Sequence, residues 1–127
     1  TRKITRGVAD IVAGKASKIT LGNLKAKRDW GYAPDYVVAM HLIMQADEPS
    51  TFVVATGETH SVEEFLERSF DLVGLDWRKY VDTDADLMRP TEVPLLLGDA
   101  SKAKRVLGWE PTVRFDELVE IMIKSDA

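Results

Sequence analysis

Apolar residues recur at helical spacing in five stretches of the chain. The first stretch places Ile4, Val8 and Ile11 on one face before Gly14 ends the pattern. Two later stretches begin at residues that favour the start of a helix, Ser61 and Asp99. The pattern therefore predicts five amphipathic helices, at about residues 3–13, 34–45, 61–73, 99–107 and from 116 onward.

The second of these helices is expected to bury a wide apolar face. Pro34 suits the first helical position, and Asp35 suits the positive end of the helix dipole. The apolar residues that follow are Val37, Val38, Met40, Ile43 and Met44. His41 lies among them and is therefore interpreted as a core or edge histidine rather than as a ligand.

Strand signals are fewer and shorter. Residues 51–56, with the sequence TFVVAT, are rich in β-branched side chains and predict a buried strand. Shorter strands are expected at 18–21 and 80–82, while Pro90 and Pro94 exclude a helix where they stand. The predicted fold is therefore a mixed α/β domain of helices and short strands, without a complete sheet.

Length and composition are those of one globular domain: 127 residues, 45% hydrophobic and 30% charged. A net charge of −4 provides no field that would attract nucleic acid or an anionic membrane, so any anion site must be built locally. The absence of cysteine excludes disulfides and fits a cytoplasmic protein. No apolar run reaches the roughly 20 residues of a membrane span. Because the chain opens with Thr1 and enters a helical pattern directly, it is expected to be part of a longer protein.

Motifs for nucleophilic, phosphate-loop and metal chemistry are missing from the sequence. There is no Gly-x-Ser-x-Gly and no glycine-rich phosphate loop. His41 and His60 lie 19 residues apart, and neither has a partner at metal-ligand spacing. His60 precedes the expected N-cap residue Ser61, so it is interpreted as a loop or capping contact.

Three basic residues are candidates for binding an anion. Lys3 lies at a helix start, where a bound anion would relieve the unfavourable contact of a cation with the positive dipole end. Arg28 follows an expected strand, and its planar guanidinium can hold two phosphate oxygens. Arg89 precedes Glu92, whose carboxylate can accept hydrogen bonds from sugar hydroxyls. Arg28 and Arg89 could instead form ordinary salt bridges, Arg28 with Asp29 and Arg89 with Glu92. The residues alone therefore leave open whether these arginines bind an anion or a neighbouring carboxylate.

Five motifs follow one another along the chain: TRKI at 1–4, LGNLKAKRDWGYA at 21–33, ATGETHSV at 55–62, RPTEV at 89–93 and LGD at 97–99. Together they resemble the GDP-mannose 4,6-dehydratase family, within the extended short-chain dehydrogenase/reductase superfamily. The resemblance covers nearly the whole chain in order, and the 21–33 block is specific within that superfamily.

The resemblance implies a cytoplasmic, homo-oligomeric enzyme that converts GDP-mannose to GDP-4-keto-6-deoxymannose plus water with bound NADP. It implies an N-terminal Rossmann domain that binds NADP and a smaller C-terminal domain that binds the sugar nucleotide. Residues 1–127 correspond to the second domain alone. The family's glycine-rich loop, its Tyr-x-x-x-Lys pair and its dehydration residues have no counterpart here, so no catalytic residue is expected in this chain.

The resemblance also implies roles for seven residues. Lys3 and Arg28 are expected to hold the diphosphate. The guanine and nucleoside end is expected to be lined by Leu21, Gly22 and Asn23. Arg89 and Glu92 are expected to close over phosphate and ribose. Two alternatives stay open: a non-catalytic module that binds nucleotide sugars, and a related sugar-nucleotide epimerase or reductase.

Overall fold

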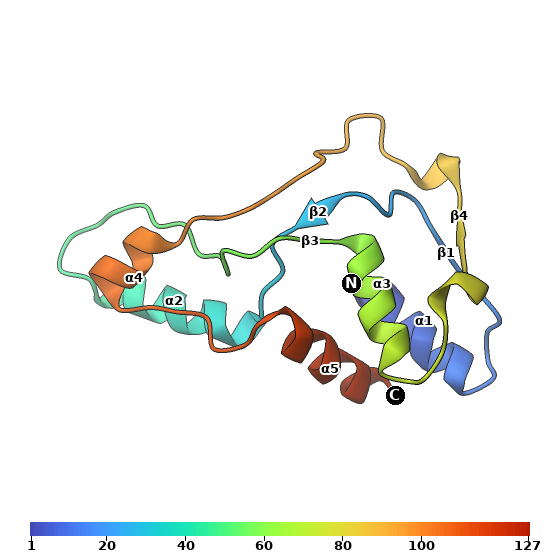
Figure 1. Cartoon of the computed structure of the whole chain (residues 1–127). Helices are drawn as coiled ribbons and strands as arrows, with labels where there is room; N and C mark the ends of the chain where they lie inside the picture. The colour runs from blue at the N-terminus through green and yellow to red at the C-terminus, as the bar shows by residue number, and fades with distance from the viewer.

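Five α-helices and two short two-stranded ladders make up the fold in the computed structural model, which describes all 127 residues (Figure 1). All five predicted helices are present. The helices are α1 (Arg2–Val12), α2 (Ala33–Gln45), α3 (Val62–Asp71), α4 (Ser101–Leu107) and α5 (Phe115–Asp126). The strands are β1 (Ile19–Leu21), β2 (Lys27–Arg28), β3 (His60–Ser61) and β4 (Val81–Thr83). Two 3₁₀ turns, η1 (Trp77–Lys79) and η2 (Ala85–Leu87), flank β4.

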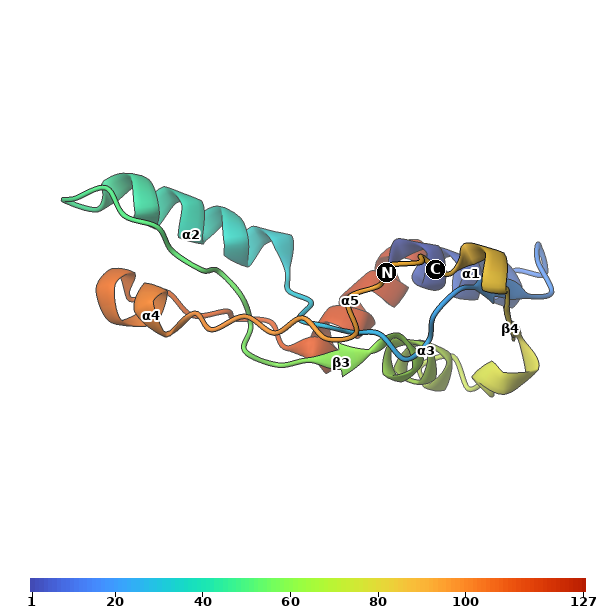
Figure 2. The same ribbon diagram turned by 90° about the horizontal axis from the view of Figure 1, so that it is seen from above.

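The elements gather into two lobes, which lie at opposite ends of an elongated molecule (Figures 1 and 2). The large lobe contains α1, α3, α5 and the β1–β4 ladder around a core that includes Val8, Phe65 and Val119. The small lobe contains α2, α4 and the segment around Trp109, with Ala39 and Ala103 at its centre. Extended segments connect the two lobes. The helices pack against one another within each lobe.

The two ends of the chain meet in the large lobe, where α1 and α5 pack side by side (Figures 1 and 2). The hydroxyl of Thr5 donates to the Asp126 carboxylate at 2.6 Å, and Arg2 lies 3.4 Å from the same carboxylate. Arg2 therefore pairs with the last turn of α5.

Two segments distant in sequence, residues 19–28 and 81–96, run side by side in the same direction. β1 pairs with β4 in parallel, with Ile19 opposite Val81 and Leu21 opposite Thr83. Farther along, Lys27 donates its backbone N–H to the Pro94 carbonyl and accepts from the Leu96 N–H, both at 2.9 Å. We call residues 19–28 and 81–96 the paired segments.

The predicted strand at residues 51–56 is wrong. These residues form no ladder with any other segment, and Val53 is exposed although Ala55 and Thr56 are buried. A strand is defined by the backbone hydrogen bonds that it makes to a neighbouring strand. The β-branched composition of this stretch indicates extended backbone, but no other segment of the chain pairs with it as a strand.

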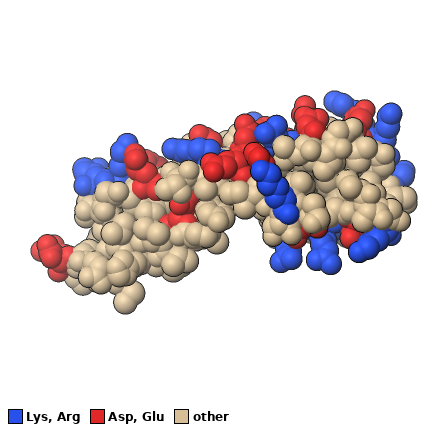
Figure 3. Space-filling view, turned by 90° about the horizontal axis from the view of Figure 1, so that it is seen from below, with Lys and Arg blue, Asp and Glu red and all other residues tan.

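The prediction that α2 buries a wide apolar face is also wrong. Val37 is 61% exposed and Met44 is 82% exposed, and Val38 and Met40 are exposed as well. His41 is exposed rather than a core histidine. The part of the molecule that holds α2 and α4 shows a broad surface without charged side chains (Figure 3).

No helix in the structure has the length and apolar character that crossing a membrane requires.

Candidate functional site

Six of the seven predicted binding residues lie on the paired segments. Leu21, Gly22, Asn23 and Arg28 belong to the first segment, while Arg89 and Glu92 belong to the second. Lys3 is the exception, since it lies in the first turn of α1, where it is exposed and makes no ion pair. The fold therefore gathers residues that are more than 60 positions apart in sequence onto one pair of neighbouring segments.

Arg28 is held by three oxygen atoms of its neighbours. Its Nη2 lies 2.5 Å from Glu92 Oε1, and its Nη1 donates to the carbonyl oxygens of Val93 at 2.7 Å and of Lys27 at 2.8 Å. The side chains of Arg28 and Glu92 are about a quarter exposed, at 23% and 24%. A guanidinium carries five N–H donors, so two of them remain free to bind an anion.

The salt bridges that sequence reasoning considered are not the ones that form. Arg28 pairs with Glu92 rather than with Asp29. Arg89 is exposed and makes no ion pair. One ion pair does form, between Arg28 and Glu92. Both of these residues were predicted to bind ligand.

Gly22 lies at a close approach of the paired segments. A Cβ atom at this position would lie 2.7 Å from the carbonyl oxygen of Leu87, which is closer than a carbon atom can approach. The side chain of Leu21 is buried in the core of the large lobe, so only its backbone faces the segment. Asn23 accepts a hydrogen bond from the Lys25 N–H at 2.9 Å, which leaves its amide N–H donors free.

The sequence did not reveal the hydrogen bonds that Asp29 makes, because it suggested Asp29 only as a salt-bridge partner for Arg28. Its carboxylate instead accepts from Thr56, Gly57 and Gly98. These donors come from two loops that are distant in sequence from Asp29. In the sequence, Asp29 carried no signal of this role beyond its place next to Arg28.

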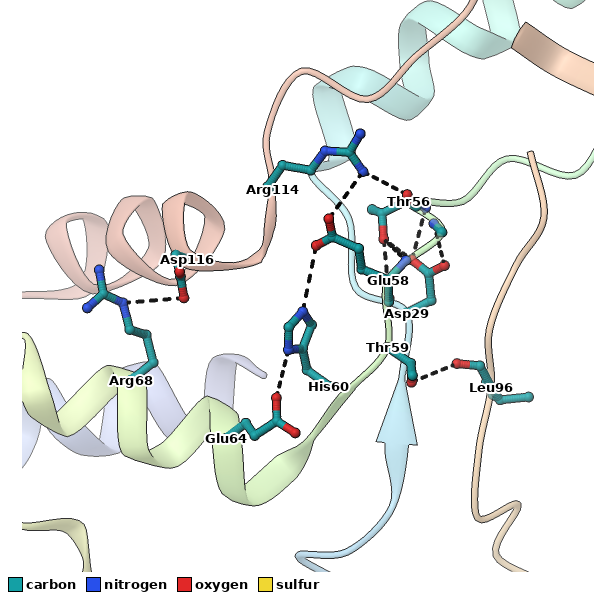
Figure 4. Close-up of polar contacts among 11 residues, drawn as sticks. Asp29, Thr56, Glu58, Thr59, His60, Glu64, Arg68, Leu96, Arg114 and Asp116 are labelled. Carbon is teal, nitrogen blue, oxygen red and sulfur yellow. Dashed lines mark hydrogen bonds and ion pairs between the residues drawn. The ribbon is translucent and has the colours of Figure 1, made fainter. Parts of the chain in front are cut away.

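A second polar cluster joins the start of α3 to the start of α5 (Figure 4). His60 Nδ1 lies 2.7 Å from a Glu64 carboxylate oxygen, and the imidazole stacks on Phe115 with ring centroids 3.8 Å apart. Arg114 donates to the Thr56 carbonyl at 2.8 Å and lies 3.6 Å from Glu58. His60 was interpreted as a loop or capping contact, and in the structure its side chain bonds to the side chain of Glu64 in the first turn of α3.

The pKa of the Glu64 carboxyl is shifted by this cluster. Burial by itself raises the pKa, but hydrogen bonds from His60 and from the Ser61 backbone N–H outweigh it and lower the pKa below its ordinary value. No three His, Asp or Glu side chains of the chain are arranged to hold a metal ion. Through the stacking of His60 on Phe115, the cluster connects the start of α3 to the start of α5.

Two hollows of the surface lie away from the predicted binding residues. One, of about 400 Å³, is lined by Thr56, Gly98, Lys104, Trp109 and Arg114, among others. Another, of about 650 Å³, lies between α4 and the loop that follows α2. Neither includes any of the seven predicted binding residues. Apart from Leu21, those residues lie on an open surface, half-buried or exposed.

The chain is similar in sequence to proteins of one family. Residues 1–122 match the family model described as GDP-mannose 4,6 dehydratase. GDP-mannose 4,6 dehydratase 2 of Arabidopsis thaliana is 55% identical over 126 residues, which cover 99% of this chain and 34% of that protein. The chain thus spans about a third of the length of this curated relative.

Solved structures share the fold at lower sequence identity. RMD from Pseudomonas aeruginosa, complexed with NADPH, has a TM-score of 0.85 at 18% identity over 97% of this chain and 40% of that chain. UDP-glucose 4-epimerase from Bifidobacterium longum, in complex with NAD+ and UDP, has a TM-score of 0.75 at 18% identity over 94% of this chain and 38% of that chain.

Proposed function

Because the chain belongs to the GDP-mannose 4,6 dehydratase family, we propose that it is the part of such an enzyme that binds GDP-mannose. The complete enzyme would convert GDP-mannose to GDP-4-keto-6-deoxymannose plus water with bound NADP. In this proposal residues 1–127 form its C-terminal nucleotide-sugar-binding domain, and the complete enzyme is a cytoplasmic homo-oligomer.

The observation that carries the proposal is the state of Arg28. Its guanidinium is fixed by Glu92 and two carbonyl oxygens, is partly withdrawn from water, and keeps two N–H donors free. A fixed guanidinium of this kind forms strong, charge-assisted hydrogen bonds to phosphate. Arg28 would therefore bind the diphosphate of GDP-mannose.

The other predicted residues would complete the site around Arg28. Lys3 and Arg89, which are exposed and make no ion pair, would add positive charge at the diphosphate. Gly22, Asn23 and the backbone of Leu21 would line the nucleoside end, and Glu92 would meet the ribose hydroxyls. Binding energy from this remote part of the substrate would place the hexose for reaction elsewhere in the enzyme.

The residues of this chain do not fit NADP. The parallel ladder, β1–β4, has two strands and is not followed by a glycine-rich turn into a helix. The Pseudomonas aeruginosa protein, which is complexed with NADPH, extends well beyond the 40% that this chain covers. In our proposal the rest of the complete enzyme binds the cofactor, and we assign no step of hydride transfer to these residues.

Similarity to the epimerase does not change this proposal. At 18% identity the Bifidobacterium longum protein shows a common fold only. The Arabidopsis thaliana dehydratase is 55% identical across nearly the whole chain, which favours a GDP-mannose dehydratase over an epimerase or a non-catalytic module.

Substitution of Arg28 in the complete enzyme tests the proposal. Arg28→Ala is expected to weaken GDP-mannose binding by about one to two orders of magnitude, because it removes about 1.5–3 kcal/mol of charge-assisted hydrogen bonding. Isothermal titration calorimetry measures the change. Arg105→Ala, at an exposed arginine of α4, is the matched control and should leave the affinity unchanged. Equal affinities of Arg28→Ala and the unsubstituted enzyme would refute the role of Arg28.

The isolated polypeptide of residues 1–127 provides a separate test. Supplied with NADP and GDP-mannose, it is expected to form no 4-keto product, because it contains no Tyr-x-x-x-Lys pair and no dinucleotide site. Product formation is measured by chromatography of the sugar nucleotides. Turnover by the purified polypeptide would show that the catalytic groups lie within this chain.

A further inference from the structure

The carboxylate of Asp29 accepts four hydrogen bonds, two at each oxygen, and Figure 4 shows those that come from Thr56. Oδ1 accepts from the backbone N–H of Thr56 at 2.9 Å and from its hydroxyl at 2.5 Å. Oδ2 accepts from the N–H groups of Gly57 at 3.0 Å and of Gly98 at 3.2 Å. One side chain therefore joins three chain segments directly beside Arg28.

The segment at 92–98 is attached to three consecutive residues around β2. Glu92 and the Val93 carbonyl hold the Arg28 guanidinium. The Lys27 backbone exchanges hydrogen bonds with residues 94 and 96. Asp29 holds the far end of the segment at Gly98. The contact at Gly98 thus fixes the position of segment 92–98 along β2. This position determines where Glu92 and the Val93 carbonyl, which hold Arg28, lie.

Gly98 lets the segment come this close. A Cβ atom at position 98 would overlap the Ala55 side chain and lie 3.5 Å from Val53 Cγ1. Any larger residue would push the segment away from Asp29 and from residues 53–55. The close approach and the four hydrogen bonds are therefore two independent signs that the segment is fixed at this point.

We propose that Asp29 is a positioning residue for Arg28, which by anchoring Gly98 and the Thr56–Gly57 turn keeps Glu92 and the Val93 carbonyl on the guanidinium. The inference rests on the proposed function, in which Arg28 binds the diphosphate. Asp29 itself faces the loops and does not contact the ligand. Its loss would leave the Arg28 side chain present but free to move, so that binding a diphosphate would require it to be ordered again.

A double-mutant cycle in the complete enzyme tests whether Asp29 acts through Arg28. Asp29→Asn keeps the size of the side chain but replaces one accepting oxygen with an NH₂ group that cannot accept the hydrogen bonds of the loops. We expect it to weaken GDP-mannose binding about tenfold when Arg28 is present and less than about twofold in the Arg28→Ala background. Calorimetric Kd values for the four proteins give the coupling.

Another hydrogen-bonded carboxylate, Asp35, which is buried, provides the control. Asp35 accepts hydrogen bonds from Thr112 and Val113 in the small lobe and does not contact the paired segments. Asp35→Asn should lower the thermal stability and leave the Kd unchanged, which separates positioning from general destabilisation. If Asp29→Asn does not fold, Thr56→Val removes one donor and should weaken binding about threefold, again only when Arg28 is present.

The outcomes separate this inference from the function on which it rests. If Arg28→Ala binds GDP-mannose as well as the unsubstituted enzyme, the proposed function is refuted and the inference with it. If Arg28→Ala weakens binding but Asp29→Asn has no effect, or the same effect in both backgrounds, only the positioning role is overturned. An equal loss of affinity in Asp35→Asn would likewise overturn it.

Discussion

At the scale of single residues, buried carboxylates hold the loops of this chain in place. Asp35, at 6% exposure, accepts from the Thr112 N–H at 2.9 Å, the Thr112 hydroxyl at 2.6 Å and the Val113 N–H at 3.1 Å. Its own carbonyl accepts from the Trp109 indole at 2.9 Å. The first residues of α2 are thereby tied to the segment that leads into α5.

The pKa of the Asp35 carboxyl reflects these contacts. Burial raises the pKa, but the hydrogen bonds from Thr112 and Val113 lower it below the ordinary value of 3.8. A carboxyl whose pKa is lower in the folded state stabilises the fold above its unfolded pKa. That stabilisation is lost as the pH falls through the folded pKa.

Asp35→Asn is therefore expected to lower the free energy of unfolding by about 2–3 kcal/mol at pH 7, since an amide cannot accept all three hydrogen bonds. The difference from the unsubstituted protein should shrink as the pH falls from 3.8 through the lower pKa of folded Asp35, where its carboxyl becomes protonated. Urea denaturation at neutral and acidic pH measures both. Asp47→Asn, at an exposed carboxylate, is the control, and equal loss in the two variants would contradict the assignment.

At the scale of elements, the start of α3 combines a local cap with a contact that only the fold provides. The Ser61 hydroxyl accepts from the Glu64 N–H at 3.1 Å, which confirms Ser61 as the N-cap residue. The Glu64 carboxylate also meets the imidazole of His60, which stacks on Phe115 of α5. The cap thus fixes the end of α3 and connects it to another helix.

Removal of His60 should raise the pKa of Glu64. Its hydrogen bond is the largest of the contributions that lower this pKa, whereas burial raises it. In His60→Ala we expect the pKa of the Glu64 carboxyl to rise toward its ordinary value of 4.5, so that the stabilisation from Glu64 is lost at a higher pH than in the unsubstituted protein. Carbon-detected NMR titration measures the change. The Glu120 carboxyl, whose pKa is lowered by Lys124, is the internal control, and an unchanged Glu64 titration would contradict the assignment.

At the scale of the whole molecule, the two lobes are unequally covered. The large lobe encloses three helices around one core, whereas α2 in the small lobe leaves an apolar face in contact with solvent. Monomeric soluble proteins seldom expose a large contiguous apolar patch. The 127-residue chain by itself is therefore expected to self-associate in solution.

Met44→Glu should reduce this self-association, because it places a charge at the most exposed apolar residue of α2, 82% exposed. Size-exclusion chromatography with light scattering measures the monomer fraction. Val12→Glu adds the same charge at a similarly exposed position of the large lobe, 57% exposed, and should change the monomer fraction less. A monomeric unsubstituted chain, or equal effects of the two substitutions, would contradict the expectation.

Local patterns were sufficient to predict the helices and the family. Apolar spacing, Pro34, Ser61 and the glycines that end helices act within a few residues, so all five helices could be located from the sequence. The motif at 21–33 identified the family, which the match over residues 1–122 confirms. The predicted roles of the site residues remain predictions, although six of the seven lie on the paired segments.

The partners of these residues were decided only by the tertiary structure. Arg28 meets Glu92 across 64 positions and Asp29 meets Gly98 across 69, and the sequence carries no periodic signal for contacts at such separations. The TFVVAT stretch and the apolar face of α2 have the composition of buried elements, yet burial requires a neighbour that composition cannot specify. By itself the sequence determined which segments are helical and which chemistry they carry. Long-range packing decided which groups meet, because that depends on how separate elements dock.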